Sequence, residues 1–353
     1  MSTSLAPFSC TYSREVPDLL ATLGCSLALT TYQAGKVLLL SPNGENLTQL
    51  PRNFNRPMGM AVEGSRMAVA AGGELILLEN APSLAATYPK KPNHYDALFV
   101  PRASFYTGHL DLHDMAFTGE TLWAVNTVFS CLCHLSVRQS FRPVWTPPFI
   151  SALAPEDRCH LNGLAMDENG QPAYVTALGT GDTPGQWRED RLGGGVIIHV
   201  PTGEVVLSGL AMPHSPRLYD GALYFTLAGT GEFCVADLEA GTYEVINRVP
   251  GFARGLAKAG DYVFVGHSKL RKKHIFGDLP LTQGPTHAGV VVLHLPSGAI
   301  AGGVRYQTSC EEIYDVQVLE GTQRPGILGT HSDMHLHAIH LPGQGYWSKP
   351  KEG

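Results

Sequence analysis

The stretch DLHDMAFTGETLWAV at residues 111–125 carries the pattern on which the fold prediction depends. Polar residues lead into a short apolar segment, and a turn containing Gly separates it from a second apolar segment. This order predicts two antiparallel strands joined by a tight turn. A buried strand alone does not need the two histidines and two aspartates found at positions 109–114, so the polar lead-in requires its own explanation.

The same pattern recurs along the chain at intervals of about 40 to 60 residues, which is the length of one four-stranded propeller blade. Two packed β-sheets would also alternate strands and turns, but they do not explain why the polar lead-in recurs. We therefore predict a single all-β domain over residues 1–353, a β-propeller of six or seven four-stranded blades, with seven preferred. The other copies are RPMGMAVEGSRMAVA (56–70), HLNGLAMDENGQPAYVT (160–176), HSPRLYDGALYFT (214–226), GFARGLAKAGDYVFVG (251–266) and EEIYDVQVLEGTQRPGILG (311–329).

The N-terminal region predicts two further elements. The stretch 26–50 reads as a hairpin that either closes the ring with C-terminal strands or forms a blade of its own. An amphipathic segment at 13–24 predicts a short helix, which we expect to cap the ring.

Composition limits the function classes. A chain that is 44% hydrophobic and 16% charged can bury a large core, and its 39 Gly and 25 Pro suit many strands and turns. The net charge of −6 and the lack of a basic stripe argue against a nucleic-acid partner, and the basic run at 269–274 is interpreted as a solvated loop.

No signal-peptide pattern or membrane-spanning apolar run is visible, so we expect a cytoplasmic protein without membrane contacts. Seven cysteines without disulfide spacing predict reduced, mostly buried thiols.

Propeller geometry indicates where the polar lead-ins lie. The innermost strand of each blade lines the central channel, and its start shares one mouth of the channel with the loop between the second and third strands. The a–b turns of the opposite face, between first and second strands, contain no histidine in the five clearest repeats. We therefore expect the candidate site at the histidine-bearing mouth. Its strand starts carry Arg56, Asp111, His113, His160, Asn162, His214, Ser215, Arg254, Glu311 and Glu312, and its loops carry Tyr32, Gln33, Asn126, Thr176, His267, Ser268, Lys269, His331 and Ser332.

Three segments are too long for simple turns and are predicted to form walls or lids over this mouth. They span residues 80–110, 179–195 and 267–287. Aromatic residues that can line the pocket from them are Tyr95, Phe105, Tyr106, Trp187 and Phe276.

Several phrases resemble a bacterial family of conserved hypothetical propellers, carried as a domain of unknown function. The resemblance spans nearly the whole chain and implies the propeller fold without an established activity. More loosely, the architecture is similar to gluconolactonase-like and strictosidine-synthase-like propellers, although the Glu and Asn/Asp calcium set of those proteins is not the set at this mouth. The phrases are TTYQAGK (30–36), YDALFVPR (95–102), PPFISALAPEDRCHLNGLAM (147–166), GLAMPHSPR (209–217) and IYDVQVL (313–319).

Three functions remain open from the sequence. The first is an enzyme with a transition metal (iron, copper or zinc) that acts on a small anionic or peptidic substrate. Imidazoles from several blades can ligate such a metal, and Glu311 or Glu312 can ligate it or orient them. Iron oxygenases with one histidine per blade resemble this arrangement. The metal candidates are His113, His160, His214, His267 and His331.

The second function is a metal-free acid–base hydrolase, lyase or isomerase that acts on a small anionic or peptidic substrate. The third is a non-catalytic module that binds such a ligand or a peptide. No GxSxG elbow and no glycine-rich nucleotide loop in a strand–helix context occur, so neither a serine nucleophile nor a nucleotide cofactor is expected. The predicted catalytic residues are His160, His214, Glu312 and Arg254, and the predicted substrate-binding residues are Arg56, Asn162, Tyr32, Gln33, Lys269 and Trp187.

Overall fold

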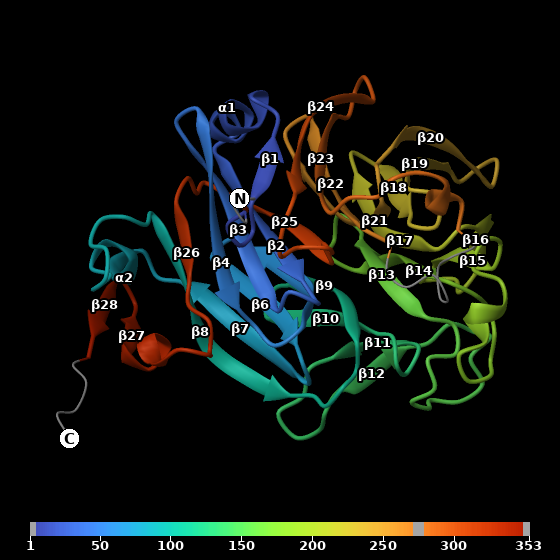
Figure 1. The fold of residues 1–353 in the computed structure, drawn as a ribbon. Helices are drawn as coiled ribbons and strands as arrows, with labels where there is room; N and C mark the ends of the chain where they lie inside the picture. The colour runs from blue at the N-terminus through green and yellow to red at the C-terminus, as the bar shows by residue number, and fades with distance from the viewer. Residues whose placement is uncertain (1–4, 271–278, 349–353) are drawn as a thin grey trace.

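The computed structural model describes residues 5–270 and 279–348, and within them six β-sheets form a closed ring (Figure 1). Each inner strand contacts the inner strands of the blades on either side, and the last contacts the first. The predicted all-β propeller is confirmed, and six is the observed count, so the preference for seven blades is wrong. Blades 1 to 6 are numbered here by their inner strands β5 (Pro57–Glu63), β9 (Leu112–Thr118), β13 (Leu161–Met166), β17 (Pro213–Tyr219), β21 (Phe252–Ala259) and β25 (Asp315–Glu320).

Blades 2, 3 and 4 are each built from four strands that follow one another in the chain and pair antiparallel from the channel outward. Burial is lowest at the outer edge: the inner strands are buried or partly buried, and the outermost strand of each of these blades is mostly exposed or partly exposed. The outer strands are β10 (Thr121–Asn126), β11 (Cys131–His134) and β12 (Arg142–Trp145); β14 (Pro172–Ala177), β15 (Gly195–His199) and β16 (Val205–Leu210); and β18 (Ala222–Leu227), β19 (Glu232–Asp237) and β20 (Thr242–Arg248).

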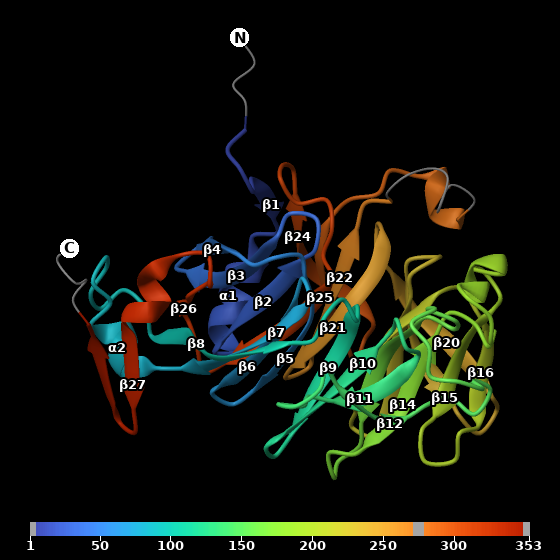
Figure 2. The same cartoon turned by 90° about the horizontal axis from the view of Figure 1, so that it is seen from below.

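Blades 1 and 5 each carry a fifth strand at the outer edge. In blade 1, β26 (Pro325–Ile327) pairs parallel with β8, and the two lie side by side in Figure 2. In blade 5, β1 (Cys10–Tyr12) pairs antiparallel with β24. The remaining strands of these blades are β6 (Arg66–Ala71), β7 (Glu74–Asn80) and β8 (Ala97–Tyr106), and β22 (Tyr262–Ser268), β23 (Gly289–His294) and β24 (Ala299–Tyr306).

Blade 6 closes the ring by joining the two ends of the chain. The N-terminal strands β2 (Cys25–Thr31), β3 (Lys36–Asn43) and β4 (Asn46–Asn53) add to the C-terminal inner strand β25. The predicted N-terminal hairpin is therefore part of a shared blade, which is why no seventh blade is needed. Because β2 occupies the place beside β25, residues 325–327 cannot be the second strand of this blade and pair with blade 1 instead.

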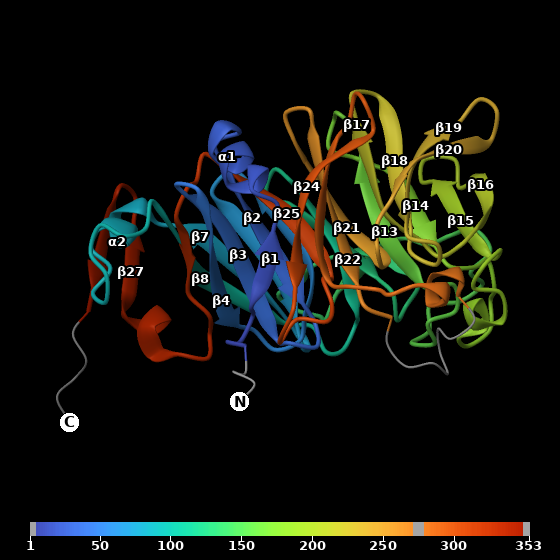
Figure 3. The same ribbon diagram turned by 45° about the horizontal axis from the view of Figure 1, so that its top comes forward.

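The helix α1 (Glu15–Thr22) is shorter than the predicted 13–24 and lies at the seam between blades 6 and 5 (Figure 3). It contacts β3 and β24, and its buried Val16 and Leu20 join the apolar core between these two blades. The helix therefore stabilises the ring closure instead of capping the ring.

A small lobe lies outside the ring, beside blade 1 (Figure 1). It contains α2 (Pro82–Ala86) and the hairpin of β27 (Ala338–Leu341) and β28 (Gln344–Trp347). Residues 80–110 thus form α2 and β8, and the prediction that they cover the channel mouth is wrong. Short 3-10 helices are η1 (Gln186–Glu189), η2 (Pro280–Gln283) and η3 (Asp333–His337).

All seven cysteines are free, and all except Cys10 are buried, as predicted. Across residues 5–270 and 279–348, the structure contains no helix with the length and apolar character that a membrane crossing requires.

Side chains tie neighbouring inner strands together at the middle of the channel. The carboxylate of Asp114 in blade 2 accepts a bond from the backbone N–H of Leu164 in blade 3 at 3.0 Å, and Arg217 donates to both of its oxygens at 2.7 and 3.1 Å. Asp315 in blade 6 accepts from the N–H of Met60 in blade 1 at 2.9 Å in the same way. Ser215 repeats the contact from blade 4 to blade 5 at 2.9 Å.

Glycine stands at the equivalent position of the alternate blades, as Gly59, Gly163 and Gly255. A Cβ on Gly59 would lie 2.8 Å from the backbone of His113, so the neighbouring strand approaches too closely for a side chain. Polar ties and glycines thus alternate from blade to blade around the inner strands.

Candidate functional site

Two layers of side chains, one residue per blade in each layer, stand above the ties at one mouth of the channel. In each blade, the residue one position before the tie residue, or before the glycine that replaces it, belongs to the lower layer, which we call the floor ring. The residue three positions before it belongs to the upper layer, which we call the rim ring. From blade 1 to blade 6 the floor ring is Met58, His113, Asn162, His214, Arg254 and Tyr314, and the rim ring is Arg56, Asp111, His160, Met212, Phe252 and Glu312.

The backbone at the rim is unusual. In blades 1 to 4 the rim residue has a left-handed conformation, with φ between 47° and 57°, although none of the four is glycine. Such a conformation costs of order 1–3 kcal/mol per residue and is maintained only where the surrounding structure imposes it. These four residues are Arg56, Asp111, His160 and Met212. The same backbone conformation is thus repeated at the start of the inner strand in four of the six blades.

A cavity of about 320 Å³ opens between these layers. Its size is that of a small-molecule site. It is lined by five floor-ring residues (Met58, His113, His214, Arg254, Tyr314), five rim-ring residues (Asp111, His160, Met212, Phe252, Glu312) and seven others (Tyr32, Leu178, Trp187, Arg188, Ser268, Lys269, Leu270).

His113 and His214 are held in the floor by backbone carbonyls. Nδ1 of His113 lies 2.9 Å from the carbonyl oxygen of Asp111, and Nδ1 of His214 lies 3.0 Å from that of Met212. Because a carbonyl only accepts, each Nδ1 carries the proton, and Nε2 is the nitrogen available to a ligand. Burial lowers the pKa of His214 to about 3, and burial followed by nearby His160 keeps the pKa of His113 well below its ordinary value. Both imidazoles are therefore neutral at physiological pH.

His160 differs because its partner is a carboxylate. Its Nδ1 donates to Oδ1 of Asp157 at 2.9 Å, and its ring packs against Trp187 with centroids 4.4 Å apart. Oδ2 of Asp157 accepts from Trp187 Nε1 at 2.9 Å and from Arg188 at 3.2 Å. The carboxylate thus fixes the tautomer of His160 and can stabilise a positive charge on its ring. The rings of His160 and His113 are 4.9 Å apart, so the two imidazoles share one part of the cavity.

Arg254 and Tyr314 form the part of the floor that faces these histidines. The guanidinium of Arg254 lies 3.7 Å from the ring centroid of Tyr314 and donates to Oε1 of Glu312 at 2.5 Å. The Tyr314 ring lies at a centroid distance of 5.3 Å from His113, two blades away, and both rings line the cavity. Arg254 Nε and the Tyr314 hydroxyl are buried without a hydrogen-bond partner among the described residues. Lys269 adds a further cation and pairs with Glu311 at 3.1 Å.

Several predicted residues lie outside the cavity. Arg56 and His109 are exposed and border a small neighbouring depression, while Gln33 is exposed and offers its backbone N–H to Glu312. Asn162 is buried and accepts a bond from Thr176 at 2.6 Å. His267 donates through Nδ1 to the carbonyl of His287 at 2.8 Å and borders a separate surface depression.

His331 is exposed and lies in the segment that follows β26. This segment is not a loop between strands of blade 6, because the strand expected near residues 325–329 pairs with blade 1. Of the predicted aromatic residues, Tyr95 packs in the outer lobe, Phe105 lines an outer groove and Tyr106 is exposed. Trp187 lines the cavity, and Phe276 lies outside the described residues.

Sequence reasoning missed part of the site. It searched for polar lead-ins, so it passed over Met58, Met212, Phe252 and Tyr314, although each occupies the repeat position of a predicted residue in another blade. Asp157 was missed as well. The feature that could have identified it is the position of a carboxylate three residues before His160, in DRCH (157–160).

No group of three His, Cys, Asp or Glu side chains within residues 5–270 and 279–348 has the arrangement of a metal site. The histidines of blades 2, 3 and 4 all line the cavity with Nδ1 bonded to an acceptor, which leaves Nε2 as the nitrogen that could ligate.

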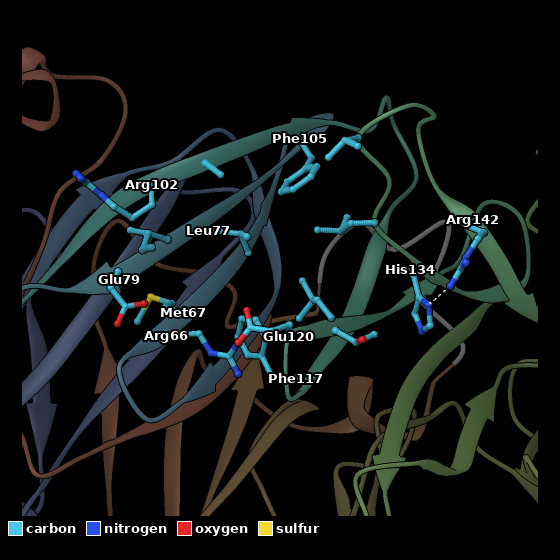
Figure 4. A pocket seen from close by; sticks show the side chains of 16 residues that line it. Arg66, Met67, Leu77, Glu79, Arg102, Phe105, Phe117, Glu120, His134 and Arg142 are labelled. Carbon is cyan, nitrogen blue, oxygen red and sulfur yellow. Dashed lines mark hydrogen bonds and ion pairs between the residues drawn. The ribbon is translucent and has the colours of Figure 1, made fainter. Parts of the chain in front are cut away.

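A second groove lies between the outer strands of blades 1 and 2, with a volume of about 450 Å³ (Figure 4). Its lining comes from β6, β7 and β8 of blade 1 and from the strands and turns of blade 2 between Phe117 and Arg142. Several of its polar groups have partners: Arg66 contacts Glu120 and also Glu63 outside the groove, and Arg142 donates to His134 at 3.1 Å. The groove has no repeated set of convergent side chains, so the channel mouth is the stronger candidate.

The family model described as a domain of unknown function (DUF4915) matches residues 14–328. The chain belongs to this family. The match ends at Leu328, just after β26, so the β27–β28 hairpin lies beyond it. Among curated proteins none matches the chain.

Solved structures share the fold at low identity. A chain from the crystal structure of a nidogen/laminin complex is similar at 10% identity with a TM-score of 0.51, over 84% of this chain and 99% of that one. A protein of unknown function from Bacteroides caccae is similar at 9% identity with a TM-score of 0.50, over 84% of this chain and 98% of that one. Similarity at this level shows the propeller fold and does not indicate an activity.

Proposed function

We propose that this protein is an enzyme that carries out metal-free acid–base chemistry on a small anionic substrate at the channel mouth. The observation that carries the proposal is the division of the cavity lining into two kinds of group. His113, His160 and His214 present unprotonated Nε2 atoms from three consecutive blades. Arg254 and Lys269 supply positive charge from the next blade.

In this proposal His160 transfers the proton. Its Nε2 accepts a proton from the substrate or from a bound water, and Asp157 stabilises the imidazolium that forms. Nδ1 of His113 has the carbonyl of Asp111 and the hydroxyl of Thr127 as partners, and Nδ1 of His214 has the carbonyl of Met212, so neither histidine has a carboxylate partner there. Burial lowers the pKa of each, so they stay neutral and accept hydrogen bonds from the substrate. Arg254 binds the anionic group, as guanidinium does for carboxylates.

The test is a substrate panel followed in D₂O by proton NMR. Nitrophenyl esters, δ-lactones, 2-hydroxy acids and 2-oxo acids would report hydrolysis, elimination and α-proton exchange in one experiment. We expect turnover of one class and a loss of at least about 10²-fold in kcat for His160→Ala. His294→Ala is the matched control, because His294 also donates or accepts locally through Nδ1, to Ser297 at 2.8 Å, away from the cavity.

Turnover that His160→Ala leaves unchanged would contradict the proposal. Saturable binding of an anion without turnover of any class would instead favour a ligand-binding module, the third function left open by the sequence.

A transition-metal centre is the second candidate. It is favoured by one observation, the tethering of Nδ1 in all three histidines, which is how metal-ligating imidazoles are oriented. Metal analysis of protein made without a histidine tag, from cells supplied with iron, copper and zinc, tests it. Stoichiometric metal that is lost in a His113→Ala, His160→Ala double variant would replace the metal-free account.

A further inference from the structure

The cavity has one apolar wall, formed by side chains of blades 3, 4 and 5. Leu178, Met212 and Phe252 line it, with only 1%, 2% and 9% of their surfaces exposed. They belong to one apolar cluster against which Leu270, another lining residue, packs. The wall is thus a continuation of a packed core and is held in place by it.

Charged groups adjoin this wall, and the guanidinium of Arg254 lies 5.8 Å from the ring centroid of Phe252. Arg254 and Glu312 stand in the adjoining blades 5 and 6, and Lys269 follows the strand β22 of blade 5. Asp111 lies further around, in blade 2, and burial raises the pKa of its carboxyl group. A ligand that fills the cavity therefore meets cations and an apolar wall side by side.

We infer that the ligand of this site is a small carboxylate that carries an apolar group, such as an aryl or branched alkyl chain. This inference rests on the proposed function and narrows its substrate class. A polyhydroxylated acid of sugar type fits less well, because each hydroxyl placed against Leu178, Met212 and Phe252 loses its hydrogen bonds to water. An unsatisfied polar group costs about 1–3 kcal/mol. An apolar group gains about 25 cal/mol for each Å² that it buries.

The experiment compares the dissociation constants of acetate, 3-phenylpropionate and gluconate by calorimetry on the full chain. We expect 3-phenylpropionate to bind at least tenfold more tightly than acetate or gluconate. Met212→Gln, which keeps the side-chain length and adds an amide, should remove most of that advantage, measured as the ratio of the dissociation constants of acetate and 3-phenylpropionate. Leu178→Gln is a second variant, and the melting temperature of each shows whether it has folded.

The outcomes separate the two proposals. Equal or tighter binding of gluconate would overturn the apolar-ligand inference while leaving an anion-binding acid–base site intact. An advantage of 3-phenylpropionate that persists in both folded variants would place its aryl group elsewhere and would also overturn the inference. Failure of all three acids to bind, even at millimolar concentration, would contradict the anionic substrate of the proposed function itself.

Discussion

Nδ1 of His160 lies 2.9 Å from Oδ1 of Asp157, while the other oxygen of this carboxylate accepts from Nε1 of Trp187. One carboxylate therefore fixes both the imidazole that faces the cavity and the indole that packs on it. Because the carboxylate only accepts, the proton of His160 is on Nδ1 and its Nε2 lone pair is directed to a ligand.

Asp157→Asn tests this relationship. Trp187 and Arg188 are both donors, so the amide oxygen of the asparagine stays with them and its NH₂ group faces His160. His160 must then accept at Nδ1 and carry its proton on Nε2, the wrong tautomer for a base. We expect kcat to fall by at least about 10²-fold with little change in KM, measured on the substrate found for the wild type.

Asp182→Asn is the control for this variant, since Asp182 pairs with Arg158 at 2.6 Å and does not contact His160. A wild-type kcat in Asp157→Asn would remove His160 from its assigned role.

The second prediction concerns anion binding by Arg254. Arg254→Gln should weaken binding of the carboxylate by roughly 10- to 150-fold, the equivalent of about 1.5–3 kcal/mol for a hydrogen bond to a charged group. Arg254→Gln also leaves a buried carboxylate at Glu312 without its cation, which can destabilise the fold. The double variant with Glu312→Gln removes this charge, so a loss of binding in it is not caused by the uncompensated carboxylate. If the folded double variant binds 3-phenylpropionate as tightly as the wild type, Arg254 is not the anion anchor.

The third prediction concerns stability in acid. Burial lowers the pKa of His267 to about 4, although its bond to the carbonyl of His287 acts in the other direction, and Arg305 adds to the lowering. Above the unfolded-state pKa of roughly 6.5, His267 is neutral in both the folded and the unfolded chain, and the free energy of unfolding has its full value. As the pH falls from roughly 6.5 toward 4, only the unfolded chain takes up the proton, so the free energy of unfolding decreases. The loss from this one group is about 1.4 kcal/mol per pH unit.

His267→Asn keeps a donor for the carbonyl of His287 and cannot be protonated. We therefore expect a shallower loss of unfolding free energy between pH 6.5 and 4 than in the wild type, measured by urea denaturation. Parallel curves for the two proteins would show that this histidine is not buried as described.

The fourth prediction concerns the ties between inner strands. Asp114→Asn breaks the two-oxygen contact with Arg217 and leaves a largely buried guanidinium without its anion. Removing one partner of a buried ion pair costs about 3–5 kcal/mol. Asp220→Asn removes the partner of Lys258 from a side chain that is 79% exposed, and should cost less than about 1 kcal/mol. If urea denaturation shows that Asp114→Asn and Asp220→Asn lower the free energy of unfolding by equal amounts, the Asp114 tie does not hold the ring together.

The repeat in the sequence was sufficient to predict the propeller and to place His113, His160, His214, Arg254 and Glu312 at one mouth. The blade count could not be read from it, because ring closure depends on which strand pairs with β25, and pairing between chain ends leaves no local pattern. The same ambiguity misplaced His331, whose segment was read as the second strand of blade 6.

The other errors have a physical cause in strand geometry. Side chains alternate between faces, so His267 at the end of β22 points to a different environment from its neighbour Ser268, which lines the cavity. The apolar members of the two rings carry no chemical signal alone. They become visible only when Tyr314 is aligned with His113, and Phe252 with His160.

The central claim is that three histidines present unprotonated Nε2 atoms to a ligand cavity. The most direct test is nitrogen NMR of ¹⁵N-histidine-labelled protein near neutral pH, before and after addition of 3-phenylpropionate. The account predicts Nδ1–H tautomers for His113, His160 and His214, with Nε2 signals that shift on saturable binding while those of His199 and His294 stay unchanged. Nε2–H tautomers in the pocket, or ligand-induced shifts confined to histidines outside it, would contradict the account.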